Sequence, residues 1–310
     1  MRRRTILTGG IILLAGAAAL AFGIVQTNAN LDSNTTSEAK NPGRKASEDS
    51  KKYWYDGTAE ISSYSLSQAR YGEMREGTAV LLYVTEPFSP SSNTKADSHR
   101  DDNVQVIKLN AMKNFNTGIY PYSLMTSTFF PFEGENTSMK IGFTMQEWCG
   151  TMYSEMRNKD GALTFDLNSY FEGESFKNKK VSTKYLEDDI WTLLRLNPDE
   201  LPEGEVKMVP SMSYMRMKHV PLRAYQAKAL MGEGEDGQKT YTLSYPDLNR
   251  TLTITYEKEF PYSILSWEET YPDGGAVLTT KAERIKQIKS DYWNRSSNSD
   301  AYLRAKLGLE

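Results

Sequence analysis

The chain has 310 residues, of which 25% are charged and 39% are hydrophobic, a balance that supports a sizeable folded core. Its formal net charge is −3, so it lacks the basic surplus that phosphate backbones attract, and we expect no nucleic-acid partner. The single cysteine excludes an internal disulfide and a cysteine-based zinc cluster.

The first thirty residues have the layout of an export signal. Three arginines at positions 2–4 precede an uncharged apolar run from Ile6 to Val25, and small residues follow at Thr27 and Ala29. Residues 1–29 are therefore predicted to be a signal peptide that leads the chain to the periplasm or cell envelope. The run is also long enough to span a bilayer of roughly 30 Å. If uncleaved, it contacts the membrane as an N-terminal anchor, and the route, Sec or twin-arginine, stays open.

A polar segment separates this leader from the folded part. Residues 30–52 contain Pro42 and Gly43 and almost no large aliphatic side chains, so they cannot bury enough apolar surface to order themselves. They are predicted to form a disordered linker. Residues 53–310 then form a single β-rich domain.

From Tyr53 onward the hydrophobic pattern alternates with period two. In the segment 250–256, one face carries Leu252, Ile254 and Tyr256 while threonines occupy the other face. Such alternation is typical of strands with one buried face. Turn-forming pairs such as Asp160-Gly161 separate the runs at hairpin spacing. The predicted fold is therefore mainly β, an antiparallel curved sheet or incomplete barrel.

Two segments show helical spacing instead, so we expect one or two helices to cover the sheet. Within residues 182–198, apolar residues recur at intervals of three and four, at Leu186, Ile190, Leu193 and Leu194. Thr183 is the expected N-cap of this helix. At the chain end, a short helix should start at a cap on Ser299 and end at Gly308.

Aromatic and methionine side chains mark a candidate ligand surface. The stretch from residue 114 to 132 holds six aromatic residues and no charge, and one strand phase carries Tyr120, Tyr122, Phe130 and Phe132. A methionine cluster follows, in which Met212 and Met215 are the candidates. Soft and aromatic side chains suit an adaptable apolar cavity. They also fill β cores, and the sequence leaves this alternative open.

Catalytic and cofactor motifs are missing from the sequence. It has no Gly-x-Ser-x-Gly elbow, His-Glu-x-x-His helix or Gly-rich phosphate loop, so we expect no cofactor and no metal. His99 lies in a polar loop, where a solvated side chain is expected, and His219 has no carboxylate at triad-like spacing, so structural roles are favoured for both. The carboxylate clusters Asp101-Asp102, Glu187-Asp188-Asp189 and Glu268-Glu269 are expected on solvated faces. Cys149 falls in the apolar phase of a strand, which predicts a buried, inert thiol.

Two segments carry a resemblance to known proteins, YWYDGTAEISSYSLSQARYGEMREGTAVLLYVTEPFS and KNFNTGIYPYSLMTSTFFPF. Through them, the chain resembles a group of exported, functionally uncharacterised proteins from Bacteroidota and related bacteria, from about Tyr53 to Trp293. Such proteins are sometimes labelled septum formation inhibitor Maf. True Maf pyrophosphatases have an N-terminal Ser-x-Ser-x-x-Arg loop and alternating βα units, and this sequence has neither in a matching context. The architecture is also similar to lipoprotein carriers, whose half-open barrel holds acyl chains.

These features favour a non-enzymatic cell-envelope protein. The leading hypothesis is that its concave β face binds an apolar ligand, a lipid or acyl chain, or an envelope protein partner. Two alternatives stay open. One is an envelope hydrolase that acts on a glycan or ester through carboxylates or His219, and the other is a structural module that only binds a partner. The ligand and the oligomeric state are not specified by the sequence.

Overall fold

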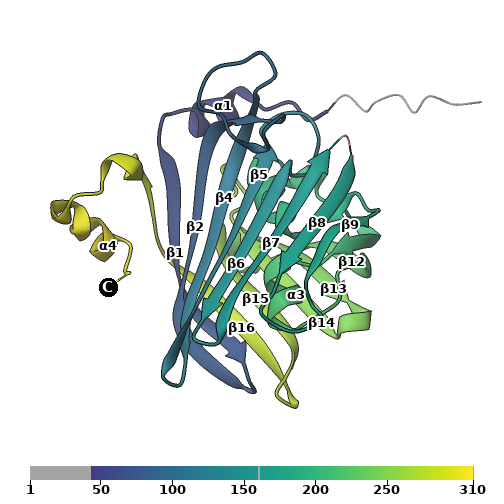
Figure 1. Ribbon diagram of the computed structural model, residues 1–310. Coiled ribbons are helices and arrows are strands. Elements are labelled where there is room, and N and C mark those ends of the chain that lie inside the picture. Colours follow the sequence, from purple (N-terminus) through teal and green to yellow (C-terminus); the bar gives the residue numbers. More distant parts are fainter. Residues whose placement is uncertain (1–42, 160, 310) are drawn as a thin grey trace, which may run out of the picture. The chain divides into compact units, whose positions relative to one another are not determined.

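One large sheet dominates the protein. The computed structural model describes residues 43–159 and 161–309, so the apolar run at residues 6–25 lies outside the described part (Figure 1). The strands join in the order β10-β11-β12-β13-β14-β15-β16-β1-β2-β4-β5-β6-β7-β8-β9, and β3 pairs with β2. Their bounds are β1 Ala59–Arg70, β2 Glu73–Ser89, β3 Thr94–Lys95, β4 Val104–Thr117, β5 Tyr120–Pro131, β6 Lys140–Glu147, β7 Gly150–Lys159, β8 Ala162–Asn168, β9 Phe176–Val181, β10 Tyr185–Leu186, β11 Gly204–Val209, β12 Tyr225–Glu233, β13 Lys239–Tyr245, β14 Arg250–Tyr256, β15 Ile264–Asp273 and β16 Ala276–Ser290.

The sheet is curved and open. Neighbouring strands pair in antiparallel fashion, apart from the short parallel pair β10–β11. The strands at the two ends of the sheet, β9 and β10, do not pair with each other. The prediction of a mainly β, antiparallel, incomplete barrel is thereby confirmed. Edge strand β9 is largely exposed and carries Lys177, Lys179 and Lys180, and such charges hinder pairing with other chains.

Period-two alternation sets the two faces of the sheet. In β14, Leu252, Ile254 and Tyr256 are buried while the intervening threonines are only half-buried, as the sequence predicts. In β5, alternate residues are buried in the same way from Tyr122 to Phe130. This alternation turns one continuous apolar face toward the concave side, where the main core lies.

Two helices occupy the concave side of the sheet. Helix α2 (Glu187–Leu196) and helix α3 (Met212–Met217) both contact β5. Helix α2 begins after the predicted cap at Thr183, because Tyr185 and Leu186 pair with β11 as strand β10. Its N-cap residue is Leu186, which has no capping side-chain bond, so the predicted cap is wrong.

The remaining helices are short. Helix α1 (Glu48–Trp54) is capped by Ser47 and overlaps the segment that the sequence assigned to a linker, and Arg44 pairs with Gly134 just before it. Helix α4 (Tyr302–Lys306) lies near the C-terminus beside β1 and is followed by Gly308 at φ 65°, as predicted for its end (Figure 1). The predicted cap at Ser299 is wrong, because Ser297 forms the capping box with Asp300 and Ser299 lies inside the helical turn that follows. The 3-10 helices are η1 Pro198–Glu200, η2 Glu235–Gly237, η3 Pro246–Leu248, η4 Tyr292–Asn294 and η5 Asn298–Ala301. Across residues 43–159 and 161–309, none of the helices has the length and apolar character needed to cross a bilayer.

Candidate functional site

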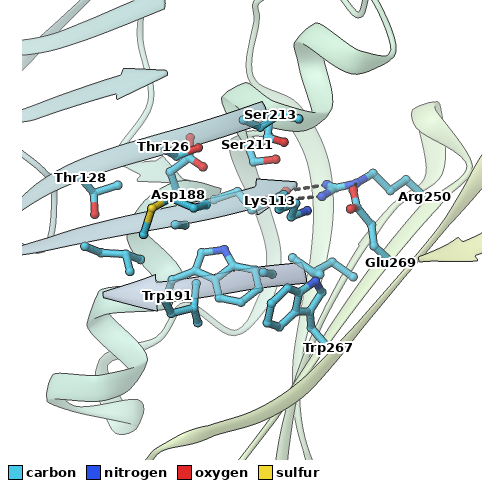
Figure 2. Close-up of a pocket in the computed structure, with 18 residues that line it drawn as sticks. Lys113, Thr126, Thr128, Asp188, Trp191, Ser211, Ser213, Arg250, Trp267 and Glu269 are labelled. Atoms are coloured by element: carbon cyan, nitrogen blue, oxygen red, sulfur yellow. Dashed lines mark hydrogen bonds and ion pairs between the residues drawn. The ribbon is translucent and has the colours of Figure 1, made fainter. Parts of the chain in front are cut away.

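A cavity lies between helices α2 and α3 and the concave face of the sheet (Figure 2). About 60 Å³ of it is open to the centres of water-sized molecules. One water needs roughly 10–15 Å³ on this measure, so the cavity has room for a small chain of atoms. Its polar lining residues are Lys113, Thr126, Thr128, Glu187, Asp188, Ser211, Ser213, Arg250 and Glu269. Its large apolar lining residues are Leu81, Leu109, Met112, Leu124, Trp191, Leu252 and Trp267.

A buried ion-pair cluster forms one wall of the cavity. Arg250 on β14 donates from both terminal nitrogens to Glu187 at the start of α2, each at 2.6 Å. Its Nε donates to Glu269 on β15 at 2.7 Å, and the Tyr245 hydroxyl donates to Glu187 at 2.8 Å. All four side chains are buried, and the two carboxylates hold the pKa of Arg250 well above its usual value despite the burial. Arg250 is therefore charged, and each of its three side-chain nitrogens donates to a carboxylate.

The other end of α2 is held by a second buried ion pair. Arg195 donates from both terminal nitrogens to Glu60 on β1, from Nη2 at 2.7 Å, and its Nε donates to the Pro261 carbonyl at 2.8 Å. The guanidinium also lies 5.2 Å from the ring of Trp54 and 5.0 Å from that of Tyr83. Neither Arg195 nor Glu60 lines the cavity.

Two carboxyl groups of α2 are buried without a cation bonded to them. Burial raises the pKa of Asp188 to about 7, and the charges of Glu187 and Asp189 add to the shift. Burial also raises the pKa of Asp189 to about 7. Asp188 accepts a hydrogen bond from the Met212 amide at 3.0 Å, and Asp189 accepts one from the Ser138 amide at 3.1 Å. Of the two, only Asp188 lines the cavity.

Lys113 adds an ammonium group to the cavity lining that has no ion-pair partner in the described part of the chain. It extends from the concave face of β4, where its neighbour across the strands is Leu124, and in Figure 2 it is drawn between Asp188 and the Arg250–Glu269 pair. No described residue forms a hydrogen bond with its ammonium or an ion pair within 4 Å. Burial lowers the pKa of Lys113, and the more distant carboxylate of Glu269 opposes this only in part.

Two tryptophans form the apolar wall. The rings of Trp191 on α2 and Trp267 on β15 meet edge to face, with centroids 5.2 Å apart. Trp267 is 2% exposed and Thr128 is 1% exposed, yet neither Trp267 Nε1 nor the Thr128 hydroxyl has a hydrogen-bond partner among the described residues. Buried polar atoms are nearly always bonded, so these two suit a ligand that supplies a partner.

The six sequence-predicted contact residues lie close to the cavity but do not line it. Tyr122, Phe130 and Phe132 are buried core residues, and Tyr120 is half-buried against them. Met212 and Met215 are buried within α3. The cavity is lined instead by the residues between the aromatics on the same face of β5, namely Leu124, Thr126 and Thr128.

The prediction that the carboxylate clusters lie on solvated faces is wrong for most of their members. Glu187, Asp188, Asp189 and Glu269 are all buried. Asp101, Asp102 and Glu268 are exposed as predicted, and Glu268 pairs with Lys281. The alternation along the strands could have identified two of the buried charged residues. Glu269 lies on the same strand face as buried Trp267 and Tyr271, and Arg250 lies on the same face as buried Leu252. Lys113 shares its phase with Phe115 in the same way.

Cys149 and the histidines lie away from the cavity. Cys149 is exposed in the turn between β6 and β7, so the prediction of a buried thiol is wrong. The strand ends at Glu147, whose carboxylate raises the pKa of the thiol through a hydrogen bond. His219 is exposed, with Nδ1 2.5 Å from Glu174, and His99 lies exposed in a loop. Within the described ranges, no group of three or more His, Cys, Asp or Glu residues is arranged to hold a metal ion.

Comparison with known proteins gives a single distant likeness to report. No family model matches the chain, and no curated protein matches it. A solved structure, titled as a beta-barrel-like protein of domain of unknown function DUF1849 from Brucella abortus, shares 10% sequence identity with it. The alignment covers 76% of this chain and 98% of that chain, with a TM-score of 0.44. The resemblance to proteins labelled as septum formation inhibitor Maf stays a prediction.

Proposed function

We propose that this protein is an exported cell-envelope protein that binds an apolar ligand, a lipid or acyl chain, inside its curved sheet and performs no chemistry on it. The observation that carries the proposal is the cavity bounded by Trp191 and Trp267. Small-molecule sites are concave, mostly apolar and provided with a few polar groups, which is the composition of this cavity. The export signal at residues 1–29 supports the location.

The arrangement of α2 suits a binding role. The helix crosses the concave side of the sheet, with Glu187 bonded to β14 at its start and Arg195 bonded to β1 near its end. Its Trp191 carbonyl accepts a hydrogen bond from Tyr83 on β2 at 3.0 Å. Since the helix is fixed at three points, the cavity beside it keeps its shape without a ligand. Such preorganisation lowers the cost of binding.

Fluorescence quenching tests the proposal. Bromine quenches tryptophan emission at short range, so 8-bromooctanoate and 8-bromooctanol should both quench the protein in a saturable manner. Ala111→Phe, which fills the cavity from β4, should abolish quenching, whereas Leu230→Phe on the exposed face of β12 should not. Solvent extraction of protein purified from its native envelope should release an apolar compound. Absence of both saturable quenching and an extracted ligand would rule out the proposal.

A hydrolase is the second candidate, favoured by Asp188. A carboxyl group with a pKa of about 7 lines the cavity, and general bases work best when their pKa is close to the ambient pH. If the protein hydrolyses an envelope ester, Asp188→Asn should remove the activity while the protein stays folded. Turnover that is unchanged in Asp188→Asn, or absent from the wild type, would exclude this candidate.

A further inference from the structure

We propose that the ligand carries a carboxylate head group, and that Lys113 binds this head group while the chain lies against Trp191 and Trp267. This inference rests on the proposed function and adds to it the chemical class of the ligand. It follows from three properties of the cavity: an unpaired cation, a buried donor that lacks an acceptor and a small volume.

The two cations at the cavity differ in what they can still bind. Arg250 uses its Nε and both terminal nitrogens on Glu187 and Glu269. Lys113 is half-buried at the cavity, with three donor hydrogens and no bonded partner in the described part of the chain. A carboxylate forms short charge-assisted hydrogen bonds with an ammonium. Lys113 is therefore the group that is free to bind an anion.

The uncharged polar groups around Lys113 also favour an acceptor-rich head group. Trp267 Nε1 can only donate, and the hydroxyl of Thr128 can donate; neither has a partner among the described residues. Thr126, Ser211 and Ser213 add further hydroxyls to the lining, and a hydroxyl can either donate or accept. Trp267 Nε1 therefore decides the preference, because only an acceptor can bond it. An ammonium head group would leave this nitrogen unbonded and would place a second cation beside Lys113.

Volume distinguishes a carboxylate from larger anions. The roughly 60 Å³ open to the centres of water-sized molecules corresponds to about five such groups. A carboxylate followed by a short single chain fits this space, while a phospholipid head group with two chains does not. The partly exposed side chains of Lys113, Trp191 and Ser213 leave a path by which a longer chain reaches the surface.

Binding of three matched amphiphiles tests the assignment. Calorimetry with octanoate, octanol and octylammonium should show octanoate binding at least about tenfold more tightly than octanol, because a charge-assisted hydrogen bond adds more than a neutral one. Octylammonium should bind weakest. Lys113→Met should bring octanoate to the affinity of octanol, and Lys113→Arg should retain part of the preference. Lys228→Met removes the same charge from the exposed face of β12 and should change nothing.

Each result separates the two proposals. If octanol binds as tightly as octanoate, or if Lys113→Met keeps the preference of the wild type, the head-group assignment is wrong and chain binding stands. If none of the three compounds binds, the proposed function fails together with the inference. The selectivity of the wild type decides the matter even if Lys113→Met does not fold.

Discussion

The two ends of helix α2 are held by the same kind of bond in very different surroundings. At one end, Arg195 and Glu60 are 1% exposed, bonded to each other and enclosed by aromatic rings. At the other end, Arg250 bonds Glu187 and Glu269 equally well, but a cavity lies beside them. There, Lys113 adds a further cation and Asp188 a further carboxyl.

The difference separates a structural ion pair from the proposed binding site. At the Arg195 end, the ion pair is balanced one to one, and the spare nitrogen of Arg195 reaches a carbonyl. At the Arg250 end, the charges also balance, but the buried donors of Thr128 and Trp267 have no partner among the described residues, and half-buried Lys113 has no bonded partner there. Trp54 Nε1 beside Arg195 also lacks a partner, but it does not border the cavity. Unused buried donors are retained at a cost in stability. That cost is understandable if a ligand bonds them.

The largest expected effect comes from breaking the enclosed pair. Glu60→Gln leaves Arg195 with an uncompensated charge in the core, so the free energy of unfolding should fall by about 3–5 kcal/mol. Urea unfolding at pH 7 measures this. The control, Glu268→Gln, breaks an exposed pair with Lys281 and should cost less than about 1 kcal/mol. Equal losses in the two variants would show that the Arg195 pair does not hold α2.

The pH dependence of stability should come from the cavity end. Asp188 faces Glu187 and Asp189 on its own helix, Arg250 on β14 and Lys113 on β4. Its folded pKa of about 7 exceeds the usual aspartate value of 3.8, and the pKa of Asp189 is raised likewise. Between those values the folded state holds protons that the unfolded state has lost. Stability should therefore fall as pH rises from about 4 to about 7 and level off above that, by about 1.4 kcal/mol per pH unit and carboxyl.

Urea unfolding between pH 5 and pH 8 tests this expectation. Asp188→Asn keeps an oxygen that can accept the Met212 amide hydrogen bond, and it should reduce the slope by one carboxyl's share. Asp247→Asn on the surface should leave the slope unchanged. A free energy of unfolding that rises with pH in the wild type would contradict the assignment. By contrast, burial acts to raise the pKa of Glu60, but Arg195 outweighs it and holds that pKa below its usual value, so the enclosed end should not titrate in this range.

Breaking the ion pair beside the cavity should cost less than breaking the enclosed one. In Glu187→Gln, Arg250 retains the carboxylate of Glu269, so its charge stays compensated, and the amide can still accept from the Tyr245 hydroxyl. We expect a loss of about 1–3 kcal/mol, the range for a buried hydrogen bond to a charged group. The comparison with Glu60→Gln under identical urea conditions is the measurement. A larger loss in Glu187→Gln would reverse the contrast between the two ends.

The sequence predicts the fold far better than it predicts this site. Period-two alternation depends on burial at each position, and it is visible locally, so the antiparallel curved sheet follows from segments such as 250–256. The cavity combines β4, β14, β15 and α2, which are far apart along the chain, and its charged residues show no motif spacing. From the sequence alone, Glu187 is interpreted as an exposed carboxylate at a helix start. Only the structure shows that it bonds Arg250.

The aromatic candidates illustrate the same limit. The phase that contains Tyr122 and Phe130 does face the concave side, as an apolar ligand surface requires. Alternation cannot tell which residues of that phase are covered by helices and which border a space. The threonines between the aromatics border the cavity because α2 and α3 pack over the neighbouring positions.

The smallest expected effect separates unused donors that face the cavity from those that do not. Thr128 and Thr192 each have a buried hydroxyl without a partner among the described residues, but only Thr128 lines the cavity. Replacing either by valine removes an unbonded polar group at nearly constant shape, so both variants should gain up to about 1 kcal/mol in urea unfolding. Valine is favoured in a strand, as at Thr128, and at Thr192 on α2 it replaces a side chain that is already β-branched. Only Thr128→Val should weaken octanoate binding, because its hydroxyl alone can reach a ligand. If Thr192→Val also weakens octanoate binding, a change in stability and not a lost contact controls the affinity. If Thr128→Val gains stability without weakening binding, the ligand does not bond this hydroxyl.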